Sequence, residues 1–143
     1  MVSRLSTGAL AVLCLFSFVG VETATRAADE QKPYVVKDGK VDQHAYNGWR
    51  RYTESCLRCH GPDGSGSSYA PDLTESLKHM SEEDFKDVVI NGRKNVTTSS
   101  ENVMPAFGEV EDVVSYLDDI YAYLKARSDG VVGRGRPERF SQQ

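Results

Sequence analysis

The first regular pattern along the chain is helical. Apolar positions recur at i, i+4, i+7 and i+11, at Ala45, Trp49, Tyr52 and Cys56. Asp42 precedes this series and belongs to the residue types that cap the start of a helix. The pattern therefore predicts a helix that begins after Asp42 and carries one apolar face up to a cysteine.

Further helices are predicted by the same reasoning. Ser81 is a good N-cap, residues 82–84 are acidic, which suits the positive end of a helix, and Gly92 stands where a C-terminal cap belongs. Residues 71–79 predict a short helix. The clearest pattern is the last one, with apolar positions at Val113, Leu117, Ile120 and Leu124.

The segments between these helices are polar or rich in turn-forming residues. Residues 33–41 contain a Lys-Asp-Gly turn and predict a small hairpin or extended arm. Residues 61–68 are rich in glycine and serine and predict a loop, and residues 93–102 are polar and predict an irregular segment. Residues 128–143 hold arginines among glycine and proline, so we expect them to be extended on the surface or disordered. The fold class is therefore all-α.

Residues 1–27 have the pattern of a removable export signal. Arg4 gives a positive start, residues 9–21 form an apolar run, and Thr25 and Ala27 place small residues at the −3 and −1 positions of a cleavage site. The run is shorter than the roughly 20 residues that cross a bilayer. We expect cleavage near Ala27 and export to the periplasm without stable membrane insertion; a retained anchor is the alternative. The remaining chain then divides into an N-terminal arm, 28–41, a main domain, 42–127, and a basic tail, 128–143.

The charge of the exported chain restricts its partners. The whole chain has a formal net charge of −4, and removal of residues 1–27 changes it to −5, because two arginines and one glutamate leave. An acidic surface repels nucleic acid and favours a protein with a basic patch. A chain of 143 residues also builds a modest core, to which a large apolar cofactor would add substantially.

The strongest chemical signal is Cys56-Leu57-Arg58-Cys59-His60, the attachment motif of c-type haem. Thiols at i and i+3 lie on the same side of a helical turn, where each can add to one vinyl group along one edge of the porphyrin. The adjacent His60 is then directed under the ring to bind the iron. The sequence therefore predicts one covalent haem c on Cys56 and Cys59, with His60 as an iron ligand.

Two other uses of the cysteines fit less well. A zinc site needs four ligands, but only two cysteines follow residue 27, and His44 and His79 lie far away in sequence. A redox-active dithiol is expected within a β-α-β pattern, which this sequence does not show.

A sixth iron ligand has four candidates in the exported chain, namely Met80, Met104, His44 and His79. Met104 is favoured because the fixed φ of Pro105 and the ring of Phe107 are suited to hold its thioether against the iron. Met80 has another explanation, since it precedes the Ser81 cap and suits a hydrophobic staple with Phe85. Met80, His79 or an open sixth position remain alternatives, and His44 is expected to be solvated.

Weaker site predictions concern the surroundings of the haem. The carbonyl of Pro71 follows the glycine-rich loop and is positioned to accept a hydrogen bond from His60 Nδ1, and Leu73 would then pack on the haem. Arg93, Lys94 and Asn95 are candidate partners for the propionates, or they are simply solvated residues of a polar loop.

The chain resembles the class I c-type cytochromes over nearly all of its length after residue 27. Gly48 matches the first-helix position at which a glycine in that family lets the terminal helix cross closely. Pro71, Leu73 and Met104 also fall where the family's positions would place them. The resemblance implies three to five helices around one covalently bound haem c.

Three segments are similar to the methanol-metabolism cytochromes, namely residues 46–52, 95–108 and 117–127. These cytochromes resemble the electron acceptors of periplasmic quinoprotein methanol dehydrogenases, and the lanthanide-dependent enzyme is the nearer match. Relatives can carry another cysteine near Ser115 and Tyr116, which is absent here.

The resemblance implies a one-electron relay from a quinoprotein methanol or alcohol dehydrogenase to a second cytochrome or terminal oxidase. Such a carrier needs neither a general base nor a nucleophile, and the sequence offers no convincing set of either. The alternatives are a general soluble cytochrome c for another respiratory donor, and a haem enzyme or gas sensor with an open or labile sixth ligand.

Overall fold

The structure is a computed structural model that describes residues 32–96 and 101–140, so the predicted export signal lies outside the described residues. In chain order the elements are β1 (Val36–Lys37), β2 (Lys40–Val41), α1 (Gln43–Ser55), α2 (Leu57–His60), the 3-10 turn η1 (Pro62–Gly64), α3 (Leu73–Ser76), α4 (Glu82–Asn91), β3 (Arg93–Val96), β4 (Glu101–Met104), α5 (Glu111–Val114) and α6 (Leu117–Ser128). The all-α class is confirmed, and the described residues hold six α-helices, one more than expected.

Local capping accounts for the starts of the two predicted N-capped helices. The backbone N–H of Ala45 donates to Asp42 Oδ1 at 2.8 Å at the start of α1. The backbone N–H of Asp84 donates to Ser81 Oγ at 3.1 Å at the start of α4, which ends at Gly92. These bonds satisfy amides that would otherwise lack partners in the first helical turn, so both predicted starts are confirmed.

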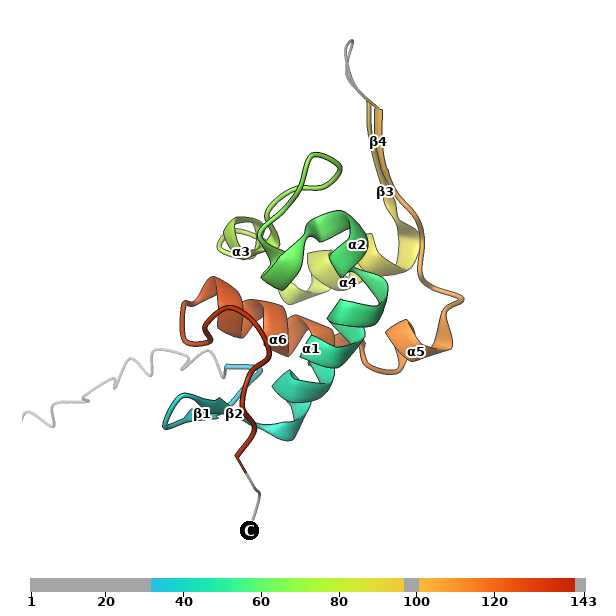
Figure 1. Cartoon of the computed structure of the whole chain (residues 1–143). Coiled ribbons are helices and arrows are strands. Elements are labelled where there is room, and N and C mark those ends of the chain that lie inside the picture. Colours follow the sequence, from blue (N-terminus) through green and yellow to red (C-terminus); the bar gives the residue numbers. More distant parts are fainter. Residues whose placement is uncertain (1–31, 97–100, 141–143) are drawn as a thin grey trace, which may run out of the picture. The chain divides into compact units, whose positions relative to one another are not determined.

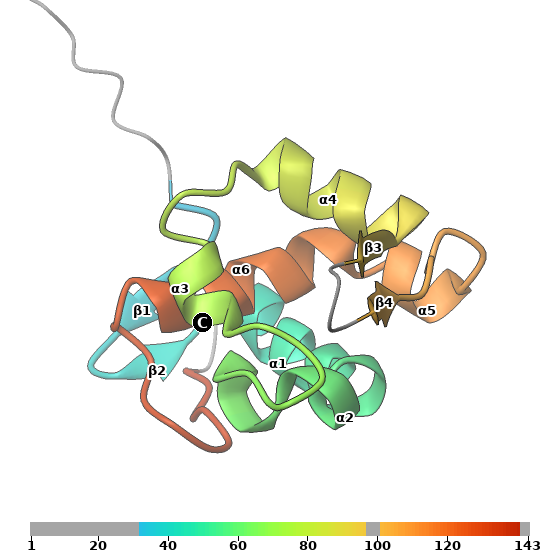
Figure 2. The ribbon, with the colours of Figure 1, turned by 90° about the horizontal axis from the view of Figure 1, so that it is seen from above.

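The core forms where α1 and α6 cross. A Cβ atom on Gly48 would lie 1.8 Å from the carbonyl oxygen of Asp119, so only glycine permits this approach of the two helices. Tyr52 from α1 and Tyr123 from α6 are fully buried beside the crossing, with their ring centroids 5.7 Å apart. Figure 2 shows α6 lying between α1 and α4. The expected role of Gly48 in this crossing is confirmed.

The predicted terminal helix is divided into α5 and α6, which is a correction to the sequence interpretation. The backbone of Tyr116 leaves helical geometry, with φ of −118° and ψ of 22°. The guanidinium of Arg51 lies 4.4 Å from the centre of the Tyr116 ring. Val113 and Leu117 are buried on either side of the break, so the apolar spacing continues across it.

Two antiparallel hairpins accompany the helices. The β1–β2 hairpin was predicted, and its turn residues Asp38 and Gly39 have positive φ angles of 50° and 73°. The β3–β4 hairpin was not predicted, because residues 93–102 were expected to be irregular. Figure 1 shows it projecting away from the helices, and its residues do not alternate between apolar and polar types, which is why no strand was predicted.

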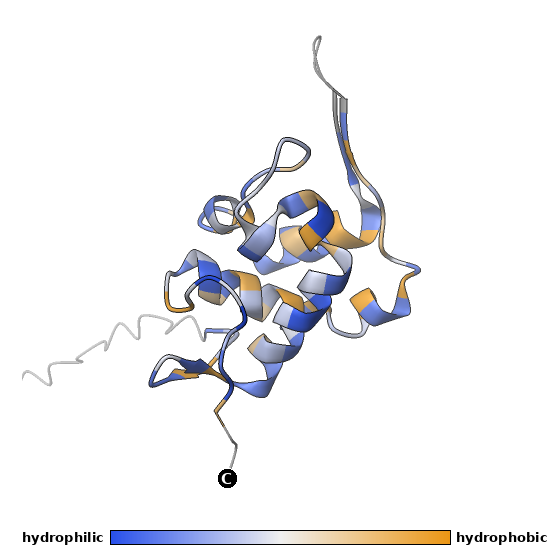
Figure 3. Ribbon diagram, viewed as in Figure 1, coloured by the Kyte–Doolittle hydropathy of each residue, from blue (hydrophilic) through white to orange (hydrophobic). Residues whose placement is uncertain are grey.

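The segment after α6 returns to the N-terminal hairpin. Val132 and Pro137 are buried, and Arg139 forms a β-bridge with Val41. Figure 3 shows that most of this segment is hydrophilic, in agreement with the expected surface location. Residues 131–140 therefore lie along the surface with two buried anchors, which contradicts the alternative of disorder for this described part.

None of the described helices is long and apolar enough to cross a membrane.

Candidate haem-binding site

The motif cysteines lie where α1 meets α2. Cys56 ends α1 and precedes α2, and its carbonyl accepts hydrogen bonds from the backbone N–H groups of Cys59 at 3.1 Å and His60 at 3.0 Å. The motif is therefore a helical turn, in which residues three apart share one side. Cys56 is half-buried and Cys59 is exposed, and both are free thiols. This arrangement fits two thioether bonds along one edge of a porphyrin.

His60 is held by the carbonyl of Pro71. The imidazole is buried, and Nδ1 lies 3.1 Å from the Pro71 carbonyl oxygen. When Nδ1–H donates this bond, Nε2 carries the lone pair that binds a metal. The donor set and its orientation therefore fit haem iron, and the structure brings Pro71 and His60 together as predicted.

The loop after His60 is fixed by buried hydrogen bonds from α1. The Tyr52 hydroxyl donates to the Gly61 carbonyl at 2.5 Å and accepts from the Gly64 N–H at 2.9 Å. Burial raises the pKa of Tyr52, so this hydroxyl keeps its proton at neutral pH. The Gly66 N–H donates to the His60 carbonyl at 2.8 Å. These contacts hold the backbone on both sides of the imidazole, and sequence reasoning assigned Tyr52 only to an apolar helix face.

Burial also affects the first thiol of the motif. It raises the pKa of the Cys56 thiol to about 11, and the nearby Cys59 adds to this effect.

The described residues contain no cluster of three or more histidine, cysteine or acidic side chains arranged to hold a metal ion.

Met104 is the last residue of β4, a strand that was not predicted. Its side chain and that of Phe107 are half-buried against the core. A Cβ on Gly92 would lie 2.7 Å from the Met104 carbonyl oxygen, so the end of α4 and the end of β4 are in close contact. Leu73 and Met80 are likewise half-buried against the core, whereas His79 is exposed. The predicted apolar residues therefore border one continuous core.

The candidate partners of the propionates lie on β3. Arg93 and Lys94 are exposed, and the recorded ion pairs of the described residues include neither of them. The backbone of Asn95 belongs to β3, but its side chain is outside the described part of the structure. Contacts between these residues and propionates remain a prediction.

Asp63 is a site neighbour that sequence reasoning missed. It is buried three residues after His60, and its carboxylate accepts from the Gly135 N–H at 2.9 Å and from Arg134 Nε at 3.4 Å. The Asp63 carbonyl accepts from Arg127 Nε at 3.3 Å. The C-terminal segment therefore contacts the loop that follows the iron ligand. The Pro-Asp-Gly turn indicated only a loop, because the partners of Asp63 are distant in sequence.

Known proteins are similar to most of this chain. A family model described as cytochrome c oxidase, cbb3-type, subunit III, matches residues 43–124. Cytochrome c-553I from Paracoccus denitrificans is 47% identical over 105 residues, which are 73% of this chain and 46% of that protein. Cytochrome c-555 from Methylococcus capsulatus is 43% identical over 100 residues, which are 69% of this chain and 75% of that protein. The chain thus spans less than half of the Paracoccus protein.

A solved structure is similar over most of the chain. The c-type cytochrome XoxG from Methylobacterium extorquens AM1 superimposes with a TM-score of 0.68 and 45% sequence identity, over 76% of this chain and 67% of that chain. The chain therefore belongs to the class I c-type cytochromes, electron carriers that hold haem c covalently.

Proposed function

We propose that this cytochrome carries single electrons from a quinoprotein methanol dehydrogenase of the lanthanide-dependent type to a second cytochrome or terminal oxidase. The observation that most directly supports this relay is the contact between His60 Nδ1 and the Pro71 carbonyl, because it leaves Nε2 free to bind haem iron. The haem supplies one-electron exchange between ferric and ferrous iron. The similarity to XoxG supports the choice of donor.

We assign Met104 as the second residue that would bind the haem iron. Its side chain, like that of Phe107, is half-buried against the core, which partly shields it from water. Two protein ligands would saturate the iron, which suits electron transfer and leaves no position for a substrate or gas. Leu73 would pack on the ring, and Arg93 and Asn95 would contact the propionates.

The proposed place of action is the periplasm. Residues 1–27 would direct export and be removed near Ala27, which leaves the arm, the cytochrome domain of residues 42–127 and the basic tail of residues 128–143. Export agrees with covalent attachment of the cofactor, because a thioether-bound haem is not lost by dilution.

Reduction of the purified ferric holoprotein tests the donor. Lanthanide-dependent methanol dehydrogenase with methanol should reduce it in a stopped-flow experiment, at a rate that falls as salt is added, because docking is partly electrostatic. A calcium-dependent methanol dehydrogenase at equal concentration is the comparison, and enzyme without methanol is the blank. If neither enzyme reduces the protein but another respiratory donor does so rapidly, the protein is a general soluble cytochrome c and not the acceptor of a methanol dehydrogenase.

A further inference from the structure

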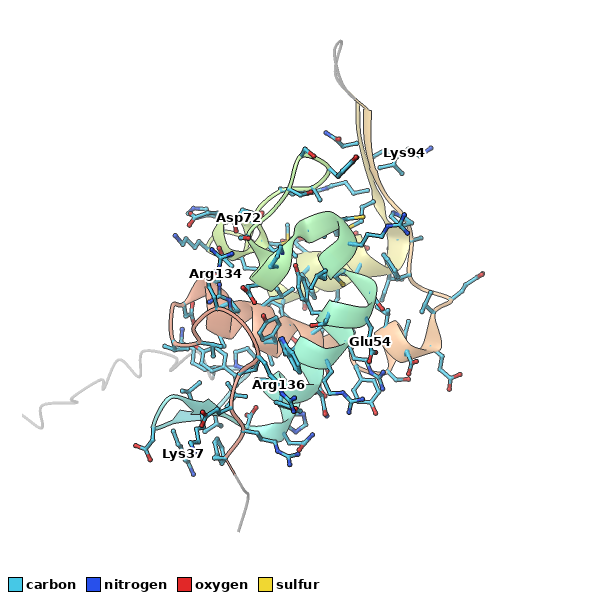
Figure 4. All side chains as sticks on the ribbon, viewed as in Figure 1. Lys37, Glu54, Asp72, Lys94, Arg134 and Arg136 are labelled. Carbon is cyan, nitrogen blue, oxygen red and sulfur yellow. The ribbon has the colours of Figure 1, made fainter. Side chains whose placement is uncertain are left out.

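Three arginines form a positive surface on this acidic protein. Arg50 lies on α1, and Arg136 and Arg139 come from the segment after α6; all three are exposed. Together with Tyr46 and Trp49 they make up what we call the arginine groove. Its centre is an open hollow of about 430 Å³ lined by Tyr46, Trp49, Arg50, Thr53, Glu54 and Arg136. Figure 4 shows Arg136 beside α1, with Glu54 farther along the same helix.

Aromatic rings hold two of the three arginines in place. The guanidinium of Arg136 lies 5.6 Å from the centre of the Tyr46 ring and 5.5 Å from that of Trp49, and that of Arg139 lies 5.5 Å from Tyr46. Arg136 also donates to the Tyr46 hydroxyl, and Arg139 donates to Gln43. Contacts with rings orient a guanidinium and leave its charge intact.

The backbone that carries these arginines is anchored on both sides. Before Arg136, the Gly135 N–H donates to the buried carboxylate of Asp63 at 2.9 Å. After it, the Val41 N–H donates to the Glu138 carbonyl at 2.8 Å, and the Phe140 N–H donates to the Val41 carbonyl at 3.0 Å. The groove is therefore built before any partner arrives, which reduces the entropy cost of binding.

The positive charge of the groove is not neutralised within the protein. The recorded ion pairs of residues 32–96 and 101–140 include none of Arg50, Arg136 and Arg139. The neighbouring Arg51 differs, because it pairs with Glu54 at 2.7 Å and with Asp112 at 3.5 Å. The carboxylate at the rim of the groove, Glu54, is thus already engaged. Guanidinium groups with free donors bind carboxylates in two-pronged hydrogen bonds.

The groove leads to the haem attachment turn. Trp49 and Cys56 are seven residues apart, so they share one face of α1 at a rise of about 10 Å along the axis. Thr53, which lines the groove, precedes Cys56 by about 4.5 Å of the same rise. A protein bound in the groove therefore sits beside one of the two thioether cysteines.

We propose that the arginine groove is a docking site for an acidic segment of a redox partner protein. Carboxylates of the partner bind Arg50 and Arg136, and the rings of Tyr46 and Trp49 hold the Arg136 guanidinium in position for this contact. Because the surface is concave, it suits a protein segment and not the flat anionic surface of a lipid bilayer. The site rests on the electron-carrier role of the family and does not depend on which donor or acceptor carries the acidic segment.

Binding is tested with the ferrous, isotope-labelled holoprotein and poly-L-glutamate. The chain has a single tryptophan, so its indole N–H gives one identifiable NMR signal at the centre of the groove. At low salt we expect the Trp49 indole signal and the amide signals of residues 46–54, 134–136 and 138–139 to shift. The Arg50→Gln/Arg136→Gln variant should weaken the apparent affinity on the order of tenfold. The single variant Arg50→Gln is included in case the double variant folds poorly. Arg50 is exposed and takes part in none of the recorded ion pairs, so its substitution should leave the fold intact.

The control removes two positive charges elsewhere. Lys37 and Lys78 are exposed outside the groove, and Figure 4 shows Lys37 at the β1–β2 hairpin. Lys37→Gln/Lys78→Gln should bind poly-L-glutamate like the parent protein. The proposal would be overturned if the NMR signals that shift belonged mainly to β3, or if both double variants lost affinity for poly-L-glutamate equally. Groove shifts with phosphatidylglycerol vesicles but none with poly-L-glutamate would also overturn it, because the surface would then be a membrane contact.

A separate measurement tests whether the groove lies beside the part of the haem through which electrons leave the protein. Ferricyanide, an anion, should oxidise the ferrous groove variant several-fold more slowly than the parent at low salt, because the attracting charge beside Cys56 is gone. The cation tris(phenanthroline)cobalt(III) should react no more slowly. Equal ferricyanide rates in the groove variant and the lysine control would show that the groove lies away from the route of electrons. Neither reagent requires methanol dehydrogenase, so these results are independent of the proposed donor.

Discussion

The backbone of Gly48 touches the carbonyl of Asp119 so closely that a Cβ at this position would lie 1.8 Å from the oxygen. The contact joins α1, which ends in the haem attachment turn, to α6, which supplies much of the core. The position of the first thioether cysteine therefore depends on how closely these two helices approach.

Gly48→Ala should destabilise the holoprotein by about 3 kcal/mol, because the two helices must separate to admit a methyl group. Guanidinium unfolding followed by circular dichroism measures this loss. Gly133→Ala is the matched control, since no atom lies within 4 Å of a Cβ built there. An equal, small change in both variants would show that the helices adjust freely at their crossing.

Removal of the hydroxyl should lower the stability of the protein at one buried tyrosine and not at another. Tyr52→Phe leaves the Gly61 carbonyl and the Gly64 N–H without their partner, which should cost about 2 kcal/mol of unfolding free energy. Tyr123→Phe should be neutral or stabilising, because its hydroxyl is buried without a partner among the described residues. Burial raises the pKa of Tyr123 to about 12. A large loss in Tyr123→Phe would reveal a hydrogen bond at that hydroxyl.

The parts of the fold that could be predicted are those determined by contacts between residues close in sequence. Asp42 and Ser81 begin their helices through bonds within the next three residues, so residue type and spacing suffice to place them. The β3–β4 hairpin lacked such a signal because its residues do not alternate between apolar and polar types. The break at Tyr116 was also hidden, since Val113 and Leu117 keep helical spacing on either side of it.

The same distinction applies to the candidate site. The Cys-x-x-Cys-His turn and the Pro71 carbonyl lie close together in sequence, and both were predicted. Asp63 was missed because it binds Arg134 and Gly135, more than 70 residues later. A pairing over that separation arises from the return of the chain after α6, which no local pattern encodes.

Asp129 should stabilise the protein in a pH-dependent way. Burial alone would raise the pKa of its carboxyl, but hydrogen bonds from Lys125, Lys32 and Tyr34 outweigh it and hold this pKa well below its ordinary value. The contribution is therefore complete above the unfolded-state pKa, about 4, and is lost as the pH falls toward the lower folded-state pKa. Asp129→Asn should cost about 2 kcal/mol at pH 7 and progressively less below pH 4, as measured by urea unfolding.

The control for this prediction is Asp38→Asn. Asp38 is an exposed turn residue with a positive φ of 50°, a conformation that asparagine also tolerates. Its substitution should leave stability nearly unchanged at every pH. A constant loss for Asp129→Asn between pH 7 and pH 2.5 would mean that the carboxylate charge contributes nothing and that packing alone is affected.

His44 should titrate above its ordinary pKa of about 6.5, because Nδ1 lies 2.7 Å from Asp119 Oδ1. Its raised pKa means that this contact contributes fully below pH 6.5 and is lost as the pH rises through the folded-state value. NMR titration of the ferrous protein measures the shift. Asp119→Asn should return the pKa toward 6.5, whereas Asp38→Asn should leave it raised; an unchanged His44 pKa in Asp119→Asn would exclude the pair as its cause.

Met104 should determine the optical spectrum of the ferric protein. A methionine sulfur bound to ferric haem iron produces a weak far-red absorption band, which Met104→Ala should abolish, whereas Met80→Ala should retain it. Loss of the thioether also opens one coordination position, so ferrous Met104→Ala should bind carbon monoxide far more tightly than the parent. Both methionines are half-buried against the same core, so either substitution removes a comparable apolar contact. If the far-red band survives in Met104→Ala and disappears in Met80→Ala, the ligand is Met80. If the parent protein already binds carbon monoxide tightly, the sixth position of its iron is open and the iron is not saturated by protein ligands.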